Sequence, residues 1–293
     1  MTYGVASMTA PLREVALRRP GKSIITAEPS AWNYGKHFDP SKIDREYDRF
    51  VSALENFGVK IHWIKGDDLG NADSVFAYDA SLMTPNGAIL MSPGKERRRG
   101  EENLHATFYR SNGIPIIGQI DPPGTAEAGD TLWLDENTML IGRGFRTNTN
   151  GAEQVKDILN SIGVKCYIFD LPFYQGRNAC LHLMSLISMV DTKSALVFKP
   201  LLPVGLWKLL VKRNINIISA PEREFHQSDT LSTNVLALAP GECLMLNSLP
   251  ETEKVLKNAK VKVTTFQAPA LCIGCEGGPT CLTRPIFRMK GFE

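Results

Sequence analysis

The stretch DTLWLDENTMLIGRG, residues 130–144, has two apolar runs on either side of a polar turn and predicts a β-hairpin. The next segment, NGAEQVKDILNSIG at residues 150–163, predicts a helix that ends at a glycine. A short apolar run, VKCYIFD at residues 164–170, predicts a third strand. The chain therefore contains a unit with the order strand, strand, helix, strand.

The same order recurs along the sequence. Residues 73–94, DSVFAYDASLMTPNGAILMSPG, predict a hairpin around Asn86-Gly87, a strong short-range signal for such a turn, with a helix and a strand to follow. Residues 232–266 repeat the unit, and residues 182–220 form a looser copy. An isolated strand, helix and strand at residues 13–64 lack a partner, which is supplied by CLTRPIFRM at residues 281–289.

These segments amount to five units of roughly 50 to 60 residues, a spacing typical of repeat architectures. Because the last strand completes the first unit, we expect a closed α/β ring that forms a single domain over residues 1–293. An irregular α/β sandwich with coincidental spacing is the alternative. In a ring, short loops from every unit meet at a central channel, so residues far apart in sequence can form one site.

Composition limits the classes of partner. With 43% hydrophobic and 22% charged residues, the chain is an ordinary globular protein, and its net charge of +2 gives no reason to expect nucleic acid as a partner. No apolar run approaches the roughly 20 residues of a membrane span. The N-terminus lacks an apolar signal core, so we expect a cytoplasmic protein whose six cysteines are free thiols.

One cysteine and one histidine are candidates for chemistry. Cys281 lies in CEGGPTCLTRP, residues 275–285, where two glycines and a proline form a turn able to hold a thiol at the mouth of a pocket. His182 opens the apolar run HLMSLISMV and has few polar neighbours in sequence. A packed core cysteine and a hydrogen-bonded core histidine are the plain alternatives. Together, the two residues match a nucleophile and its base.

Carboxylates gather on two short loops. GTAEAGD places Glu127 and Asp130 before a strand, and DSVFAYD places Asp73 and Asp79 on either side of Phe76. Such residues often serve only as turn formers, since they hydrogen-bond to their own backbone. With a thiol and a histidine, however, they make a set suited to a cationic carbon: carboxylates orient a guanidinium, the histidine moves protons and the thiolate attacks.

At these residues the chain resembles the dimethylarginine dimethylaminohydrolases, which belong to the guanidino-modifying amidinotransferase superfamily. The resemblance passes in order through DSVFAYD, PGKERRRGE, EAGD, GRGFRTN, LHLMSLISM and GGPTC. It implies a five-fold pseudosymmetric ββαβ propeller, a guanidino amino acid as substrate, and neither cofactor nor metal. A homodimer is compatible with it.

The resemblance also implies roles for individual residues. Cys281 would be the nucleophile, His182 the general acid and base, and Glu127 the carboxylate beside that histidine. The residues expected to bind the substrate are Asp73, Phe76, Asp79, Arg98, Arg146 and Cys275. Among these, Arg98 and Arg146 would hold an α-carboxylate, although Arg97 and Arg99 are alternatives to Arg98 within the same charged run.

Two positions depart from the family pattern. Tyr78 stands where dimethylaminohydrolases often have a glutamate, so the cationic end of the substrate lacks a second negative charge there. Met184 stands where arginine deiminases have an aspartate two residues after the histidine. One missing carboxylate favours an N-alkylated guanidine over free arginine, because an alkylated nitrogen needs fewer hydrogen bonds and more apolar wall.

The predicted activity is hydrolysis of such a guanidine, for example of dimethylarginine to citrulline and dimethylamine, through a covalent thiouronium. An arginine deiminase, an amidinotransferase that passes the amidino group to an amine, and a non-catalytic binding protein are the alternatives. The pair Cys272 and Cys275 with Cys281 has the spacing of part of a zinc site, but the local sequence offers no fourth ligand.

Overall fold

The computed structural model describes residues 1–68 and 70–289, and these contain five three-stranded sheets. In each sheet the middle strand pairs with one neighbour antiparallel and with the other parallel. In sheet order the strands are β15 (Arg284–Arg288), β1 (Leu12–Leu17) and β2 (Lys60–Trp63); β3 (Ser81–Thr84), β4 (Gly87–Leu90) and β5 (Ile116–Gln119); β6 (Thr131–Asp135), β7 (Thr138–Arg143) and β8 (Lys165–Asp170); β9 (Ile187–Asp191), β10 (Ser194–Val197) and β11 (Asn216–Ser219); β12 (Leu236–Ala239), β13 (Glu242–Leu246) and β14 (Lys262–Phe266).

The unit read from residues 130–170 is confirmed. Leu132 of β6 lies opposite Leu140 of β7 in an antiparallel pair, and Leu140 lies beside Tyr167 of the parallel strand β8. The helix between β7 and β8 is α5 (Thr149–Ser161), whose first turn is capped because the side chain of Asn148 accepts a hydrogen bond of 2.8 Å from the Gly151 amide. The hairpin at Asn86-Gly87 is confirmed as well, since Thr84 pairs with Gly87.

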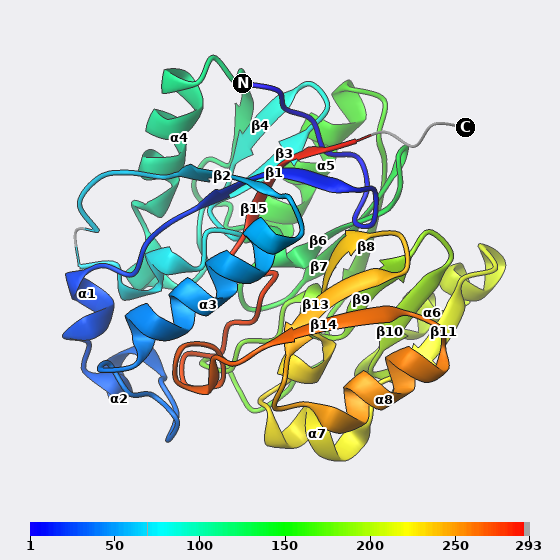
Figure 1. The fold of residues 1–293 in the computed structure, drawn as a ribbon. Coiled ribbons are helices and arrows are strands. Elements are labelled where there is room, and N and C mark those ends of the chain that lie inside the picture. Colours follow the sequence, from blue (N-terminus) through cyan, green and yellow to red (C-terminus); the bar gives the residue numbers. More distant parts are fainter. Residues whose placement is uncertain (69, 290–293) are drawn as a thin grey trace.

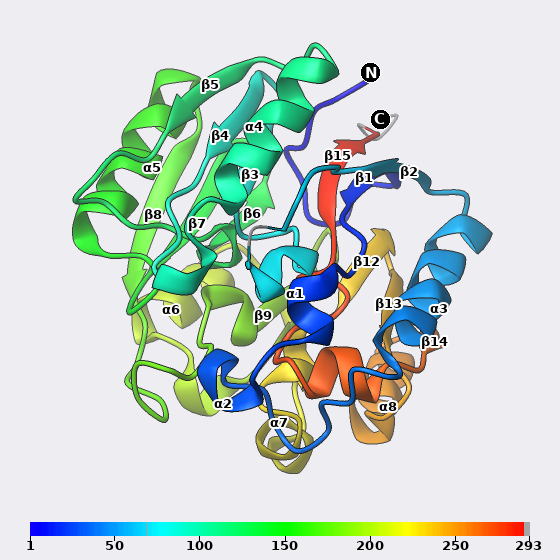
Figure 2. The ribbon, with the colours of Figure 1, turned by 90° about the vertical axis from the view of Figure 1, so that its left-hand side faces the viewer.

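The last strand closes the ring. β15 pairs antiparallel with β1, with Val15 opposite Pro285, and β1 pairs in parallel with β2. Figures 1 and 2 show the blue strand β1 and the red strand β15 side by side. The five-fold ββαβ arrangement predicted from the repeats is therefore confirmed. That all of residues 1–293 form this single domain stays a prediction, since residues 69 and 290–293 lie outside the described part.

Besides α5, the helices of the described residues are α1 (Lys22–Ile25), α2 (Pro29–Trp32), α3 (Ile43–Asn56), α4 (Glu101–Ser111), α6 (Val204–Lys212), α7 (Glu222–Gln227) and α8 (Pro250–Asn258). In Figure 2, helices such as α3, α5 and α8 lie at the outer edge of the molecule, whereas α1 lies across the middle of the view. None of the helices in the described residues is long and apolar enough to span a membrane.

A short 3₁₀ turn precedes the first strand of four units, and we call these segments the entry turns. They are Ala72–Val75, Ala128–Asp130, Leu183–Ser185 and Leu231–Thr233, ahead of β3, β6, β9 and β12. The sequence pattern predicts strands over much of this length, but the backbone bonds to itself instead. The Asp130 amide donates to the Glu127 carbonyl at 3.0 Å and the Ser185 amide to the His182 carbonyl at 2.9 Å. The first strands consequently begin several residues later than expected.

Candidate active site

Five polar side chains reach the centre of the ring, one from each unit. Each lies a few residues before the first strand of its unit, on or beside an entry turn or ahead of β15. They are Asp79, Glu127, His182, Asn234 and Cys281. The repeat itself thus gathers a carboxylate pair, an imidazole, an amide and a thiol.

Glu127 and His182 form a buried pair. His182 Nε2 lies 2.7 Å from Glu127 Oε2, and Arg146 donates to the same oxygen at 3.1 Å. The other carboxylate oxygen accepts from the Lys95 amide at 3.0 Å. Burial alone raises the pKa of Glu127, but Arg146 and His182 outweigh it and hold that pKa well below its usual range. Glu127 is therefore ionised at neutral pH.

His182 is held on both sides. Its Nδ1 lies 3.5 Å from Cys180 Sγ, and Nε2 lies 3.9 Å from Asp79 Oδ1. Burial lowers the pKa of His182, yet Cys180, Asp79 and Glu127 together raise it well above its ordinary value. The imidazole is therefore protonated at neutral pH and is suited to act first as an acid.

Asp130 positions the turn that carries His182. Asp130 Oδ1 accepts a hydrogen bond of 2.9 Å from the amide of Leu183, the residue after His182. Burial raises the pKa of Asp130 to about 6. The contact links the entry turn of β6 to that of β9, so Asp130 acts through the backbone of its neighbour.

Cys281 is partly buried and held by an amide. Asn234 Nδ2 donates to Cys281 Sγ at 3.0 Å, while Asn234 Oδ1 accepts from the Thr280 amide at 3.0 Å. Burial and the nearby Asp79 raise the pKa of the Cys281 thiol to about 12. Without a ligand the sulfur is therefore a thiol at neutral pH.

The two glycines before Cys281 are required by close packing. A Cβ at Gly277 would overlap with the ring of Phe76, and a Cβ at Gly278 would overlap with the side chain of Asn234. A glycine pair lets the backbone lie against both side chains, and this contact fixes where Cys281 enters the centre.

Asp79 is held by cations and amides of the chain itself. Arg98 NH1 donates to Asp79 Oδ2 at 2.6 Å, and the Gly129 amide donates to Oδ1 at 2.9 Å. Arg98 also bonds to Glu101 and to the Phe76 carbonyl. It is the buried arginine of its run, since Arg97 and Arg99 are exposed. Its role toward a substrate carboxylate stays a prediction, and its contacts favour holding Asp79.

Asp73 has a similar arrangement. Lys95 Nζ lies 2.6 Å from Asp73 Oδ2, and the hydroxyl of Tyr34 donates to Oδ1 at 2.8 Å. Lys95 also donates to the carbonyl of Trp32 at 2.9 Å. The segment Lys95–Arg98 therefore contacts three site carboxylates, through an amide to Glu127 and through side chains to Asp73 and Asp79.

Two small cavities meet at Cys281. One, of about 30 Å³, is lined by all six residues predicted to bind substrate, together with His182 and Cys281. The other, of about 20 Å³, is lined by Tyr78, Met184 and Asn234 among others. Shared walls between them are Asp79, Cys180, His182, Glu276 and Cys281. Glu127 contacts His182 from behind and lines neither cavity.

Comparison with known proteins agrees with this geometry. A family model described as arginine deiminase matches residues 67–207. The N(G),N(G)-dimethylarginine dimethylaminohydrolase of Pseudomonas aeruginosa is 28% identical over 78% of this chain and 84% of its own. A structure of the enzyme of that name from P. aeruginosa, in complex with citrulline, is 24% identical, with a TM-score of 0.74 over 93% of this chain and 98% of its own. A structure of an amidinotransferase of saxitoxin biosynthesis from Microseira wollei is 17% identical, with a TM-score of 0.79 over 99% and 98% of the two chains.

The chain is therefore similar to members of the guanidino-modifying amidinotransferase superfamily. Several residues that line the two cavities were not identified from the sequence, namely Trp32, Lys95, Asn234 and Glu276. The repeat could have identified Asn234 as a site residue. Asn234 precedes β12 much as Asp79 precedes β3 and Cys281 precedes β15.

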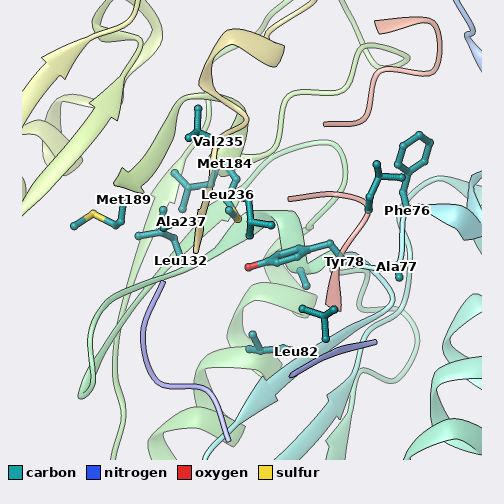
Figure 3. Close-up of a cluster of buried hydrophobic side chains, with 14 of the residues drawn as sticks. Phe76, Ala77, Tyr78, Leu82, Leu132, Met184, Met189, Val235, Leu236 and Ala237 are labelled. Atoms are coloured by element: carbon teal, nitrogen blue, oxygen red, sulfur yellow. The ribbon is translucent and has the colours of Figure 1, made fainter. Parts of the chain in front are cut away.

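Tyr78, which departs from the dimethylaminohydrolase pattern, lines the cavity of about 20 Å³ with a packed aromatic ring. Its ring lies 4.2 Å from the guanidinium of the buried Arg284, and its hydroxyl is 4.0 Å from the sulfur of Met8. Figure 3 shows the ring among apolar side chains such as Leu236, whereas Phe76 points away from that cluster. Tyr78 separates the cavity at Cys281 from a further cavity of about 10 Å³ beside Arg284.

The contacts at the centre argue against a metal site there. One ligand atom from each of Asp79, Glu127 and His182 lies within 4.8 Å of the others. The two carboxylates, however, already pair with Arg98 and Arg146, whose positive charges oppose a bound cation. Asp79, Glu127 and His182 are better described as members of a hydrogen-bonded network.

Proposed function

We propose that this protein is a cysteine-dependent hydrolase of an N-alkylated guanidino amino acid, such as dimethylarginine, giving citrulline and dimethylamine. The observation that supports this most is the convergence of Cys281, protonated His182 and Asp79 on one pair of cavities, with Glu127 behind the histidine. Those groups match the needs of nucleophilic attack on a cationic carbon followed by loss of an amine.

In the first step a guanidinium cation binds beside Cys281. Its positive charge stabilises the thiolate, so the pKa of the sulfur falls and the thiol proton leaves to solvent. The thiolate attacks the guanidinium carbon and forms a tetrahedral adduct. His182 then donates its proton to the alkylated nitrogen, the C–N bond breaks, and the amine departs from a covalent thiouronium.

In the second step His182 is neutral and acts as a base. It takes a proton from water, and the resulting hydroxide attacks the thiouronium carbon. The C–S bond breaks, the ureido product leaves, and Cys281 returns as thiolate while the second water proton passes to solvent. Glu127 stabilises each protonated state of His182 through the 2.7 Å hydrogen bond.

The preference for an alkylated guanidinium is proposed from the second cavity. Met184 and Leu231 line it next to Cys281, and both are buried apolar side chains. An N-methyl group fits such a wall better than an N–H that would be left without an acceptor. Arg146, which lines the other cavity, is proposed to contact the carboxylate of the substrate.

A panel of guanidino compounds tests this function. We expect ureido product and released amine from N-methylated arginines, with higher kcat/KM than for arginine or agmatine. Faster turnover of arginine or agmatine would exclude the methylarginine assignment and leave only the broader guanidino class. No product from any compound would exclude the hydrolase.

Arginine deiminase activity is the second candidate, because the arginine deiminase model matches residues 67–207. The two functions differ in the amine released, ammonia or a methylamine, which the same panel measures. An amidinotransferase is distinguished by adding amine acceptors to the assay. If product forms only when an acceptor is present, an amine rather than water attacks the thiouronium in the second step.

A further inference from the structure

Glu276 is an acidic residue at the centre that the proposed mechanism does not use. It lines both cavities beside Cys281 and lies in the CEGGPTC segment, five residues before the nucleophile. One carboxylate oxygen, Oε1, accepts a hydrogen bond of 2.8 Å from Asn33 Nδ2. Glu276 thus faces the space in which a substrate would lie.

The other carboxylates of the site already have cationic partners. Asp73 pairs with Lys95, Asp79 with Arg98, and Glu127 with Arg146. Within residues 1–68 and 70–289, no Lys, Arg or His nitrogen lies within ion-pair distance of Glu276. Burial raises the pKa of Glu276, whereas the Asn33 hydrogen bond and the more distant charges of Lys95 and Arg146 lower it. A cation supplied by a ligand would stabilise this carboxylate further.

The location of Glu276 is at the entrance rather than at the reacting end. Its partner Asn33 is exposed and follows α2, which carries Trp32. Asn33 also contacts the carbonyl of Asn178 on the segment ahead of His182. The exposed Asp229 is close enough to raise the pKa of Glu276. Asp229 lines neither cavity at Cys281, so Glu276 is the carboxylate that joins this entrance to the cavities and can meet a positively charged end of a ligand.

The backbone of Glu276 has a conformation that few non-glycine residues of the described chain adopt. Its φ is 56°, in the left-handed region that favours glycine, although the chain places glycine at the next two positions. A non-glycine residue in this conformation costs free energy and is often found where a side chain has a function. The chain thus has a carboxylate that lines both cavities at a position where glycine would be less strained.

We infer that Glu276 binds the α-ammonium group of the guanidino amino acid and so selects amino acids over guanidino acids that lack an amine. The inference rests on the proposed function. Asp79 and His182 lie at the guanidinium end, Arg146 is proposed to bind the carboxylate, and Glu276 with Asn33 completes the binding site at the ammonium.

The experiment pairs a substrate change with a residue change. Affinities of Nω-methylarginine and of its des-amino analogue, an N-methylated 5-guanidinopentanoate, are measured by titration calorimetry on Cys281→Ser protein, which cannot turn them over. The same measurements follow on Cys281→Ser carrying Glu276→Gln. Glutamine has nearly the same shape as glutamate and keeps an oxygen that can accept the hydrogen bond from Asn33. The substitution therefore removes mainly the charge. Asp229→Asn is the matched control, because Asp229 is a nearby carboxylate that lines neither cavity at Cys281.

Cys281→Ser protein is expected to bind methylarginine roughly 10- to 100-fold more tightly than the des-amino analogue, as for a charged hydrogen bond. Glu276→Gln should remove this preference by lowering the affinity for methylarginine alone. Asp229→Asn should change the affinity for each of the two compounds by less than about threefold. If Glu276→Gln does not fold, Asn33→Ala is the substitute, because it removes the hydrogen bond that positions the Glu276 carboxylate. It should weaken the binding of methylarginine and leave the affinity for the des-amino analogue unchanged.

Equal affinity of the two compounds for Cys281→Ser protein, or equal weakening of both by Glu276→Gln, overturns the inference. The result is independent of turnover. If the unmodified protein releases no ureido product while the ammonium preference depends on Glu276, the proposed hydrolase fails and the binding role of Glu276 stands.

Discussion

Glu127 and His182 lie 55 residues apart in sequence, yet their side chains meet in a buried 2.7 Å hydrogen bond. Each is the residue immediately before an entry turn, Glu127 ahead of β6 and His182 ahead of β9. The two units are neighbours in the ring, and Asp130 bridges their turns through the Leu183 amide. The pairing of base and carboxylate is thus a direct consequence of the repeat.

Replacing Glu127 by glutamine tests this pairing. The variant removes a charge that helps to keep the pKa of His182 well above its ordinary value. The pKa of His182 should fall, so the alkaline limb of the kcat profile, where the imidazolium is lost, should move to lower pH. We expect kcat to fall roughly 100- to 10,000-fold, as when the orienting carboxylate of a catalytic histidine is lost.

Glu153→Gln, a change at a carboxylate on the outer helix α5, serves as the control and should leave the profile unchanged. A Glu127→Gln profile that keeps its alkaline limb at the original pH would mean that Glu127 does not govern the protonation of His182.

Cys281→Ser should lower kcat at least about 1,000-fold, because a hydroxyl is a far weaker nucleophile at neutral pH. Intact-mass spectrometry of the unmodified protein during turnover should detect the thiouronium adduct, and the variant should show none. Cys166→Ser is the control, since Cys166 lies on β8 away from both cavities. Retention of more than about a tenth of the rate would remove Cys281 from the role of nucleophile.

The protonation of Cys281 can be measured without a substrate. Because its pKa is raised to about 12, the thiolate fraction should grow with pH through the whole range up to that value. Alkylation by iodoacetamide, followed on the Cys281 peptide by mass spectrometry, should accelerate about tenfold per pH unit between pH 8 and pH 10. A rate that is already constant above pH 8 would show that the resting sulfur is a thiolate.

The sequence predicted the ring because turn signals and hydrophobic runs are local and recur at a regular spacing. All six residues predicted to bind substrate line the cavity of about 30 Å³, since the resemblance maps short motifs onto fixed positions of the units, but Trp32, Lys95 and Glu276 in the same wall were not identified. Strand starts were predicted too early, at residues such as Asp73 and His182. An entry turn and a buried strand share an apolar composition, and only the three-dimensional hydrogen bonds distinguish them.

Contacts that depend on partners far away in sequence were less accessible. Arg98 looks like one of three equivalent arginines until its pairing with Asp79 and Glu101 is known. Tyr78 resembles a substitution in a substrate-binding position, whereas its ring packs on Arg284, which is 206 residues away. Such interactions follow from closure of the ring and carry no local sequence signal.

Tyr78 accordingly should matter for packing more than for polarity. Tyr78→Phe removes only a hydroxyl whose sulfur contact with Met8 is 4.0 Å long, so kcat/KM should stay within about threefold. Tyr78→Ala empties a buried aromatic site and should lower the free energy of unfolding by about 3 to 5 kcal/mol, measured by urea denaturation. A large loss of kcat/KM in Tyr78→Phe would instead give the hydroxyl a role at the substrate.

Asn234 provides the last test, because it is the centre's contribution from the β12 unit and was not anticipated. Its amide donates to the Cys281 sulfur and accepts from the Thr280 amide, so it orients the thiol and favours the thiolate. Asn234→Ala should lower kcat roughly 10- to 100-fold, as expected for the loss of a hydrogen bond to a charged group, and should slow alkylation of Cys281 at fixed pH. KM should change little, because Asn234 contacts the nucleophile rather than the ends of the substrate. Asn247→Ala, at an exposed position after β13, is the control. If Asn234→Ala raises KM while kcat and alkylation stay unchanged, Asn234 binds the substrate and does not position the sulfur.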